Sequence, residues 1–412
     1  MTPTAGALPA ATAPTHTAQP ALRLHWLRDA DALQQALPAW RALWQADAAA
    51  DLFASPDWLA WLLQCFGAGG PAGLALHQAG PDGPRFDAIA TGPWQLRVVV
   101  VTDEAGDWLA AWPLVATIGH WRGAMRPMLA SPLNFHAPRS GLTARRFDTA
   151  IARRLAQALR DEPGWQLLLP GGLPLADGRA ALLQQALAEA GLVADGAHTW
   201  PSAWLPFEGS FADYLGGPEQ AHFRRSLVKS RNGLARAGEL QWQCLSGDQA
   251  LTEGLPAFLA VDAASWKAEG GESVGRDAVL RAHYGALCER LTEQGWLEVW
   301  LLRQAGRPIA AFLCPNDGRR RYTLKSSFVD GVGGNRSPTL VLLHGLVQQA
   351  WAGWDGRAGA GIDFVGKVAF LDRWAREDLL FSSGVWWRSP WRRRVLRLQG
   401  LWRRLRAAGG GR

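Results

Sequence analysis

Three strand-like segments follow one another closely in the second half of the chain, and this order restricts the folds open to it. They cover residues 296–303, 308–314 and 321–328, and the two turns between them end in Gly306 and Gly318. Turns this short join antiparallel strands. A glycine-rich stretch then leads to a helical pattern at 338–354 and a short strand at 361–365. Antiparallel strands that lead into a helix and a further strand indicate an α+β fold rather than a doubly wound one.

The chain has 412 residues, whereas a single hydrophobic core usually stops growing at roughly 250 residues. We therefore expect two domains. The first half has its own series of strands and helices, which includes a helix that begins at Ser55-Pro56 and a strand hairpin over 95–118. We predict a disordered leader at 1–20, a first domain at 21–208, a second domain at 209–385 and a tail at 386–412.

The basic charge of the chain is concentrated in the tail. Residues 388–412 hold nine arginines and no acidic residue, and the rest of the chain carries 34 basic against 36 acidic residues. A body with this balance does not favour nucleic-acid binding, so we expect no nucleic-acid partner. In the tail, apolar residues at helical spacing face arginines, which is typical of a helix on an anionic membrane surface. Docking on the protein itself or on a partner is the alternative.

Four scattered cysteines show no C-x-x-C spacing, so the sequence indicates neither a zinc site nor a disulfide framework, and we expect no metal. The first 21 residues lack the basic and apolar regions of a signal peptide. No apolar run reaches the roughly 18 residues of a membrane-spanning helix. We expect a cytoplasmic protein, with peripheral contact to the inner face of the membrane through residues 388–412.

A series of short motifs in the second half resembles one protein family. These motifs are Arg224-Arg225 with Lys229, Ser265-Trp266-Lys267, the segment Gly306 to Ala311, Tyr322 with Lys325, Ser337-Pro338, and Asp363-Phe364 with Gly366-Lys367. In this order they resemble the CelD-like acetyltransferases of polysaccharide biosynthesis, which are GNAT proteins related to the FemAB-type transferases. The resemblance spans roughly residues 205–380. It implies tandem GNAT-like domains, each a mixed, mostly antiparallel sheet flanked by helices, with the acyltransferase in the second domain.

The region around Ser337 is predicted to bind the cofactor. Ser337 can cap the following helix and Pro338 suits its first turn, so free N–H groups and a positive dipole end face outward and can bind phosphate. An ordinary capped helix is the alternative. The resemblance implies that the diphosphate of acetyl-CoA lies here, although Thr339 stands where the family has glycine. The predicted cofactor-binding residues are Arg336, Ser337, Thr339 and Leu340.

The resemblance also implies the residues of the transfer step. Tyr322 is the predicted acid for the leaving thiolate, and Asp363 with Lys367 is placed where a carboxylate could take the proton of the attacking amine. A structural ion pair between Asp363 and Lys367 is equally open. GNAT chemistry forms no covalent enzyme intermediate, so no nucleophilic triad is expected.

The predicted acceptor site draws on both halves of the chain. Arg225 and Lys229 share the free face of a basic helix over 211–237, which could attract phosphate or simply be solvated. In the first half, a loop with Asn134, His136 and Arg139 could face the junction between domains or lie on the surface. The predicted acceptor-binding residues are Arg225, Lys229, Trp266, Lys267, Lys325 and His136.

The sequence thus predicts an N-acyltransferase that moves an acyl group, with acetyl expected, from acyl-CoA to an amine of a sugar or saccharide precursor in envelope or exopolysaccharide assembly. Two alternatives stay open. One is a FemAB-like transferase that uses aminoacyl-tRNA. The other is a catalytically silent GNAT-like module that recruits polysaccharide machinery to the membrane.

Overall fold

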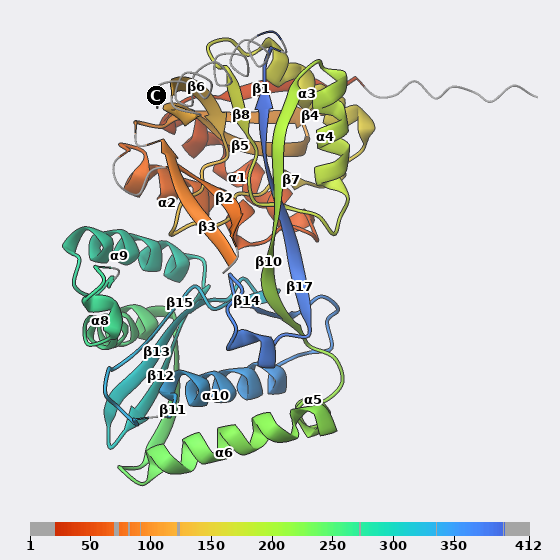
Figure 1. Ribbon diagram of the computed structural model, residues 1–412. Helices are drawn as coiled ribbons and strands as arrows, with labels where there is room; N and C mark the ends of the chain where they lie inside the picture. The colour runs from red at the N-terminus through yellow and green to blue at the C-terminus, as the bar shows by residue number, and fades with distance from the viewer. Residues whose placement is uncertain are drawn as a thin grey trace, which may run out of the picture.

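The computed structural model describes residues 21–69, 90, 92–121, 124–271, 273–334, 336–389 and 391, and the backbone alone of 74–80 and 83–89. The predicted leader and nearly all of the tail lie outside these residues. Figure 1 shows two α+β halves, one above the other, joined by two long strands. The prediction of an α+β chain with mixed, mostly antiparallel sheets flanked by helices is confirmed. None of the described helices combines the length and apolar character needed to cross a membrane.

The first half is a sheet with helices on both faces. Its order is β1-β4-β5-β6-β8, continued by β17 and β10. Val98 and Val100 of β4 contact the cluster around α1, whereas Val99 and Val101 contact the cluster around α3 and α4. This alternation follows from the period of two in a strand. The elements are β1 (Arg23–Leu27), α1 (Ala30–Ala46), α2 (Pro56–Phe66), β2 (Leu74–Gly80), β3 (Gly83–Ala90), β4 (Gln95–Thr102), β5 (Trp108–Trp121), β6 (Ala124–Ala130), β7 (Thr143–Ala144), α3 (Thr149–Asp161), β8 (Leu167–Leu169), β9 (Leu173–Pro174) and α4 (Arg179–Glu189).

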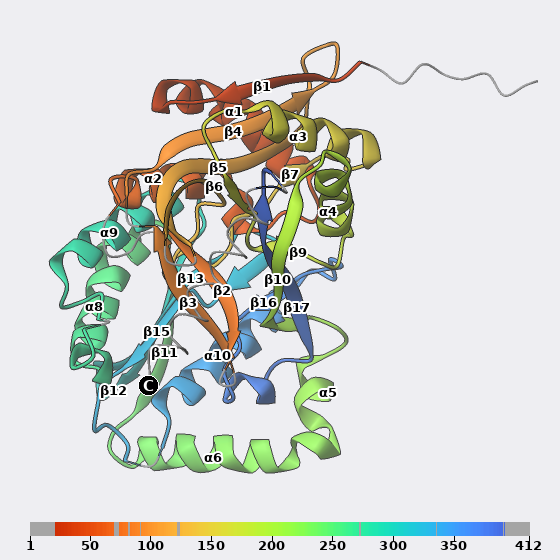
Figure 2. The ribbon, with the colours of Figure 1, turned by 45° about the horizontal axis from the view of Figure 1, so that its top comes forward.

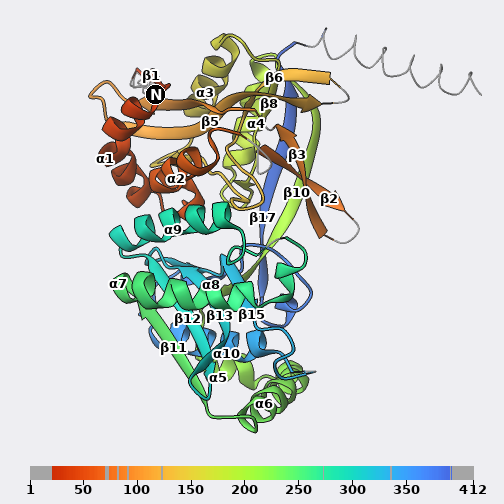
Figure 3. The ribbon, with the colours of Figure 1, turned by 90° about the vertical axis from the view of Figure 1, so that its left-hand side faces the viewer.

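Two long strands make one sheet continuous through both halves. β10 (Val193–Pro206) and β17 (Glu377–Trp387) pair antiparallel over nearly their whole length, and β17 also pairs with β8 and β9. β10 pairs in addition with β16 (Gly361–Asp363), which pairs with β14 (Arg320–Tyr322). The predicted boundary at residue 208 falls just after β10. The last strand of the predicted second domain nevertheless returns to the first half, as Figures 1 and 3 show.

The second half contains a four-stranded sheet with helices on both sides. Its order is β11-β12-β13-β15. Leu340, Leu343 and Val347 lie at helical spacing on α10 and are buried against this sheet, and α6 packs on the outer side of α10 (Figure 1). On the opposite side, α9 lies between the sheet and α2 of the first half (Figure 3). The elements are α5 (Phe211–Gly216), α6 (Ala221–Ala235), β11 (Leu240–Ser246), α7 (Gly247–Gln249), α8 (Leu255–Ala263), α9 (Ala278–Glu293), β12 (Leu297–Gln304), β13 (Arg307–Pro315), β15 (Lys325–Phe328) and α10 (Pro338–Ala352).

Two predicted elements are each divided in the structure. The basic helix expected at 211–237 is broken into α5 and α6, because Gly217 leaves the helical conformation and Pro218 begins a new turn. The single strand expected at 321–328 is divided into β14 and β15, which belong to different sheets. The prediction of one strand that carries both Tyr322 and Lys325 was therefore wrong.

Arg319 joins the two halves at the end of a helix. Its guanidinium donates to the carbonyl oxygens of Asp47 at 2.6 Å, Gln45 at 2.5 Å and Trp44 at 3.4 Å, which lie at the C-terminus of α1. The last carbonyl groups of a helix have no partner within the helix, and a cation is favourable at that end. A residue of the second half thus completes a helix of the first.

Candidate active site

The strand that was expected at residues 321–328 changes sheets at Thr323 and Leu324. Before this point β14 runs parallel to β16, with Tyr322 opposite Asp363. After it, β15 pairs with β13. The amide of Thr323 still donates to the Asp363 carbonyl at 2.9 Å, whereas the amide of Leu324 donates to the Leu313 carbonyl at 3.1 Å. Two neighbouring strands therefore part at these residues, and we call this point the split.

Tyr322 lies inside the protein at the split. Its side chain is fully buried, its hydroxyl donates to Asp317 Oδ2 at 2.8 Å, and the amide of Leu52 donates to the same hydroxyl at 3.1 Å. Burial raises the pKa of the phenol well above its ordinary value, and the Asp317 carboxylate raises it further. The group is therefore protonated at neutral pH, but its hydrogen bonds are made within the protein.

Asp363 forms a buried ion pair with Arg139, from the loop between β6 and β7. Arg139 Nη1 lies 2.7 Å from Asp363 Oδ2 and 3.2 Å from Asp51 Oδ2. Ser202 Oγ and the amide of Val365 also donate to Asp363. Burial alone would raise the pKa of Asp363, but the Arg139 guanidinium outweighs it and the pKa is lowered. Asp51, in contrast, has a pKa raised by burial, which Arg139 and Arg320 oppose only in part.

The guanidinium of Arg139 is enclosed by aromatic rings as well as by carboxylates. It lies 4.5 Å from the ring centres of both Phe53 and Phe381, and its Nε and Nη2 atoms are buried without a hydrogen-bond partner. The faces of aromatic rings attract a cation, and this attraction partly offsets the cost of burying N–H groups without hydrogen-bond partners. Of the two alternatives left open for this loop, the structure shows the position at the junction of the halves rather than on the surface.

Lys367 lies apart from this network. Its ammonium group pairs with Asp378 Oδ2 at 2.6 Å at the surface, and with Asp372 at 4.0 Å. The alternative of an Asp363–Lys367 ion pair is wrong, because Asp363 pairs with Arg139 and Lys367 with acidic residues on and next to β17. Tyr322 and Asp363 are brought together, and Lys367 is not.

The predicted cofactor residues lie at the start of α10. Ser337 is exposed and caps the helix, its Oγ accepting from the amide of Leu340 at 3.2 Å. Leu340 is buried with its neighbour Thr339, whose hydroxyl has no hydrogen-bond partner. The Arg336 side chain packs on α6: a Cβ added to Gly233 would lie 1.7 Å from Arg336 Nε. The glycine-rich loop takes the left-handed backbone conformation at Gly333, with φ of 81°.

Three predicted acceptor residues gather on the other side of the split. His136 Nδ1 lies 3.2 Å from the hydroxyl of Tyr284 in α9, and Lys325 Nζ lies 5.6 Å from the centre of the Tyr284 ring. Lys267 Nζ donates to the Ser326 carbonyl at 2.5 Å, so it is bound to β15 beside Lys325. Burial lowers the pKa of His136 to about 3, with Lys325 adding to the effect, and the imidazole is neutral at pH 7.

The other predicted acceptor residues are not in this group. Trp266 is about half exposed on the 3-10 turn that carries Lys267. Arg225 and Lys229 are exposed on α6, which packs against α10 on the opposite side of the four-stranded sheet from α8 and α9 (Figures 1 and 2). A helix on that side does not reach the group around Tyr284.

The sequence analysis missed Asp51, Ser202 and Tyr284. Asp51 precedes the Phe53-Ala54-Ser55-Pro56 segment, which was the one signal near it, and the other two stand in unremarkable strand and helix patterns. Among the described residues, no group of three or more His, Cys, Asp or Glu side chains is arranged to hold a metal ion.

Comparison with known proteins identifies the second half. Residues 221–376 match the family model described as "Acetyltransferase (GNAT) domain". The crystal structure of FemX resembles the whole chain, with a TM-score of 0.53 at 11% identity, over 87% of this chain and 96% of that one.

Two further solved structures have lower scores. A tandem GNAT protein from the clavulanic acid biosynthesis pathway gives a TM-score of 0.42 at 10% identity, over 88% of this chain and 98% of that one. The C-terminal domain of a putative lysylphosphatidylglycerol synthetase from Agrobacterium fabrum gives 0.45 at 13% identity, over 85% and 92%. A search of curated proteins gives no significant match. The prediction of a GNAT-type acyltransferase is confirmed.

Replacing Arg139 tests how far the split depends on the buried ion pair. Arg139→Met leaves Asp363 and Asp51 buried without their counter-charge, so we expect the free energy of unfolding in urea to fall by about 3–5 kcal/mol. Arg153→Met removes an arginine from an exposed pair with Glu189 and should change little. Equal losses in the two variants would contradict the assignment. Adding Asp51→Asn and Asp363→Asn to Arg139→Met should recover part of the loss.

His136 predicts a pH dependence of stability. Its pKa in the folded protein lies below the value of about 6.5 in the unfolded chain. The unfolded state therefore binds the proton first, and stability is complete above pH 6.5 and declines as the pH falls toward 3. We expect a slope of up to about 1.4 kcal/mol per pH unit from this residue, which His136→Gln removes. An unchanged slope of urea-derived stability between pH 6.5 and 4.5 would show that His136 is not held neutral.

Proposed function

We propose, with the acetyltransferase (GNAT) domain at residues 221–376 as the premise, that the chain is a CelD-like N-acyltransferase. It transfers an acyl group, with acetyl expected, from acyl-CoA to an amine of a sugar or saccharide precursor for envelope or exopolysaccharide assembly in the cytoplasm. The observation that carries the proposal is the split at Thr323 and Leu324, followed along the chain by the capped start of α10. The exposed Ser337 fits a helix start available to a diphosphate.

In the proposed reaction the amine nitrogen bonds to the carbonyl carbon of the thioester and the C–S bond breaks. The amine loses one proton and the departing sulfur takes one, so the products are an amide and a thiol. We assign the acceptor contacts to His136, Lys267 and Lys325, which lie around β15. Tyr322 and Asp363 are closed in by protein partners, so we assign them to holding β14 and β16 at the split rather than to proton transfer. Lys367 has no place in this reaction.

A FemAB-like reaction with aminoacyl-tRNA is the second candidate, and the fold match with FemX over the whole chain favours it. The near-neutral charge of residues 1–387 argues against it, because tRNA binding depends on basic surface. A titration with acetyl-CoA separates the candidates. An acyl-CoA-dependent enzyme should bind acetyl-CoA and use it as a donor, whereas an enzyme that uses aminoacyl-tRNA should not. The silent module should use neither donor.

Two variants at Thr339 test whether the side chain at this position limits acetyl-CoA binding. We expect calorimetric binding of acetyl-CoA, and release of free thiol when amino sugars are added. Thr339→Gly removes a Cβ where the family has glycine and should tighten acetyl-CoA binding several-fold. Thr339→Ala keeps the Cβ and removes the γ-methyl group and the hydroxyl, which has no partner among the described residues, so it should bind like the unaltered protein if the Cβ is what crowds the site. Absence of heat and of thiol release with every variant would refute the proposal.

We propose that the tail holds the enzyme at the membrane surface. Residues 388–412, which lie outside the described residues except for 388, 389 and 391, combine tryptophan and leucine with nine arginines. We expect the full chain to float with vesicles that contain phosphatidylglycerol, and a chain ending at residue 387 to remain at the bottom of the gradient. Equal flotation of the two would remove the membrane role of the tail.

A further inference from the structure

Arg320 lies on a buried aromatic surface with its donors unused. Its guanidinium is 5.2 Å from the centre of the Trp204 ring, and that indole covers Gly361, where an added Cβ would come within 2.6 Å of it. Stacking on an indole orients a guanidinium but uses none of its N–H groups. Within the described part of the chain, the Arg320 side chain forms no hydrogen bond and no ion pair.

Two pockets meet at Arg320. One lies between the halves of the chain, and Asp51, Asp177, Arg179 and Phe381 are among the residues that line it. The other lies between the C-terminus of α10 and the turn before β14, and Arg319, Arg321 and Arg357 line it together with Asp355. We call them the junction pocket and the arginine pocket. Arg320 lines both pockets.

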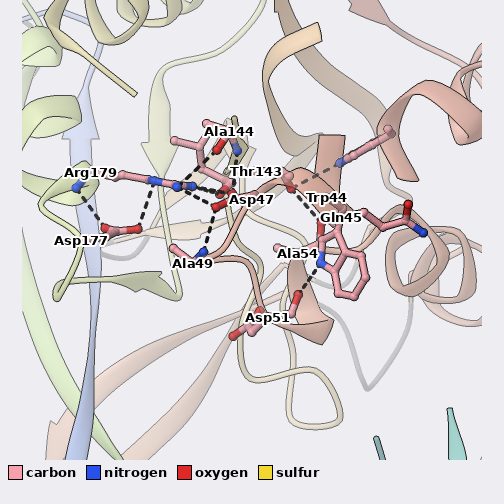
Figure 4. Close-up of polar contacts among 12 residues, drawn as sticks. Trp44, Gln45, Asp47, Ala49, Asp51, Ala54, Thr143, Ala144, Asp177 and Arg179 are labelled. Atoms are coloured by element: carbon pink, nitrogen blue, oxygen red, sulfur yellow. Dashed lines mark hydrogen bonds and ion pairs between the residues drawn. The ribbon is translucent and has the colours of Figure 1, made fainter. Parts of the chain in front are cut away.

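The other arginines of the two pockets already have protein partners. Arg319 donates to the end of α1, and Arg321 pairs with Glu298 at 3.1 Å. Arg357 pairs with Asp355 at 3.0 Å. Arg179 binds both oxygens of Asp47 and also Asp177, as Figure 4 shows. These residues raise the local potential. Of the five arginines that line the two pockets, Arg320 is the one whose side chain has no hydrogen bond or ion pair with the described part of the chain, so its N–H groups can bind a ligand.

The balance of charge differs between the pockets. In the arginine pocket four arginines face the single carboxylate of Asp355. In the junction pocket two arginines face Asp51 and Asp177, and the remaining lining is mostly apolar. A multiply charged anion is therefore favoured on the arginine side, and a neutral, partly apolar group on the junction side.

We propose that Arg320 and these two pockets bind an acceptor that carries a phosphate or diphosphate, with the phosphoryl group on Arg320 in the arginine pocket. The rest of the acceptor lies in the junction pocket beside Asp51 and extends to the split, so that its amine reaches the side of His136, Lys267 and Lys325. This description of the acceptor rests on the proposed acyl transfer, whereas the anion site does not.

The test of the anion site uses inorganic pyrophosphate and needs no turnover. We expect the full chain to bind pyrophosphate in calorimetry, both alone and with saturating CoA. Arg320→Gln keeps a polar side chain but removes the guanidinium and its charge, and it should weaken this binding at least tenfold. Arg153→Gln, which changes an exposed arginine of α3, should leave it unchanged. Thermal melting of both variants checks that they are folded.

Two results would overturn the site. One is pyrophosphate affinity that is the same in Arg320→Gln as in the unaltered chain. The other is binding that CoA abolishes, which would place the anion at the start of α10 instead. A second arm compares glucosamine 6-phosphate with glucosamine as acceptors. Arg320→Gln should raise the KM for the phosphorylated sugar about tenfold and the KM for glucosamine less than twofold. If pyrophosphate binds as expected but no acyl transfer is detected, the proposed function is refuted and the anion site is not.

Discussion

The ion pair between Arg139 and Asp363 is the interaction on which the centre of the molecule depends. It joins a loop of the first half to a strand of the second, and both side chains are almost completely removed from water. Such a pair contributes little net stability compared with apolar packing, but breaking it leaves an expensive uncompensated charge. The hydrogen bonds from Ser202 and Val365 and the rings of Phe53 and Phe381 fix its geometry. The position of β16 beside β14, and therefore the place where the strands part, follows from this arrangement.

The candidate site is consequently shared by the two halves. His136 and Arg139 come from one loop of the first half, and they reach opposite sides of the split, toward β15 and toward β16. The hydrogen bonds that the Asn134 side chain accepts from the amides of His136 and Ala137 hold this loop in a tight turn. The first half therefore contributes side chains to the site in addition to supporting it, and a second half alone would lack them.

Much of the fold could be predicted from the sequence, because its signals are local. Ser55 and Ser337 both cap the helices expected to begin beside them, and the apolar stripe of α10 is buried as its spacing indicated. The division at Thr323 could not be predicted, since nothing in the residues 321–328 distinguishes one strand from two that pair with different neighbours. The extent of β17 was missed for a similar reason: its partners lie almost two hundred residues earlier in the chain.

The same limit applies to the site. Residue types and a family resemblance selected Tyr322 and Asp363, but their burial depends on a loop that is distant in sequence. Tyr284 and Asp51 gave no signal of their own, because a tyrosine in a helix and an aspartate before a turn are common. Arg320 is one of three consecutive arginines, and only the neighbouring side chains show that its donors, unlike those of Arg319 and Arg321, are unused.

The return of β17 to the sheet of the first half has a consequence for how such a chain can evolve. β17, the last described strand, completes a sheet that begins with β1, so the first half loses part of its sheet if the second half is lost. Duplication and fusion can produce two similar halves, but once the final strand crosses over they are inherited as one unit. Recombination that replaces a single half would have to supply a matching strand as well.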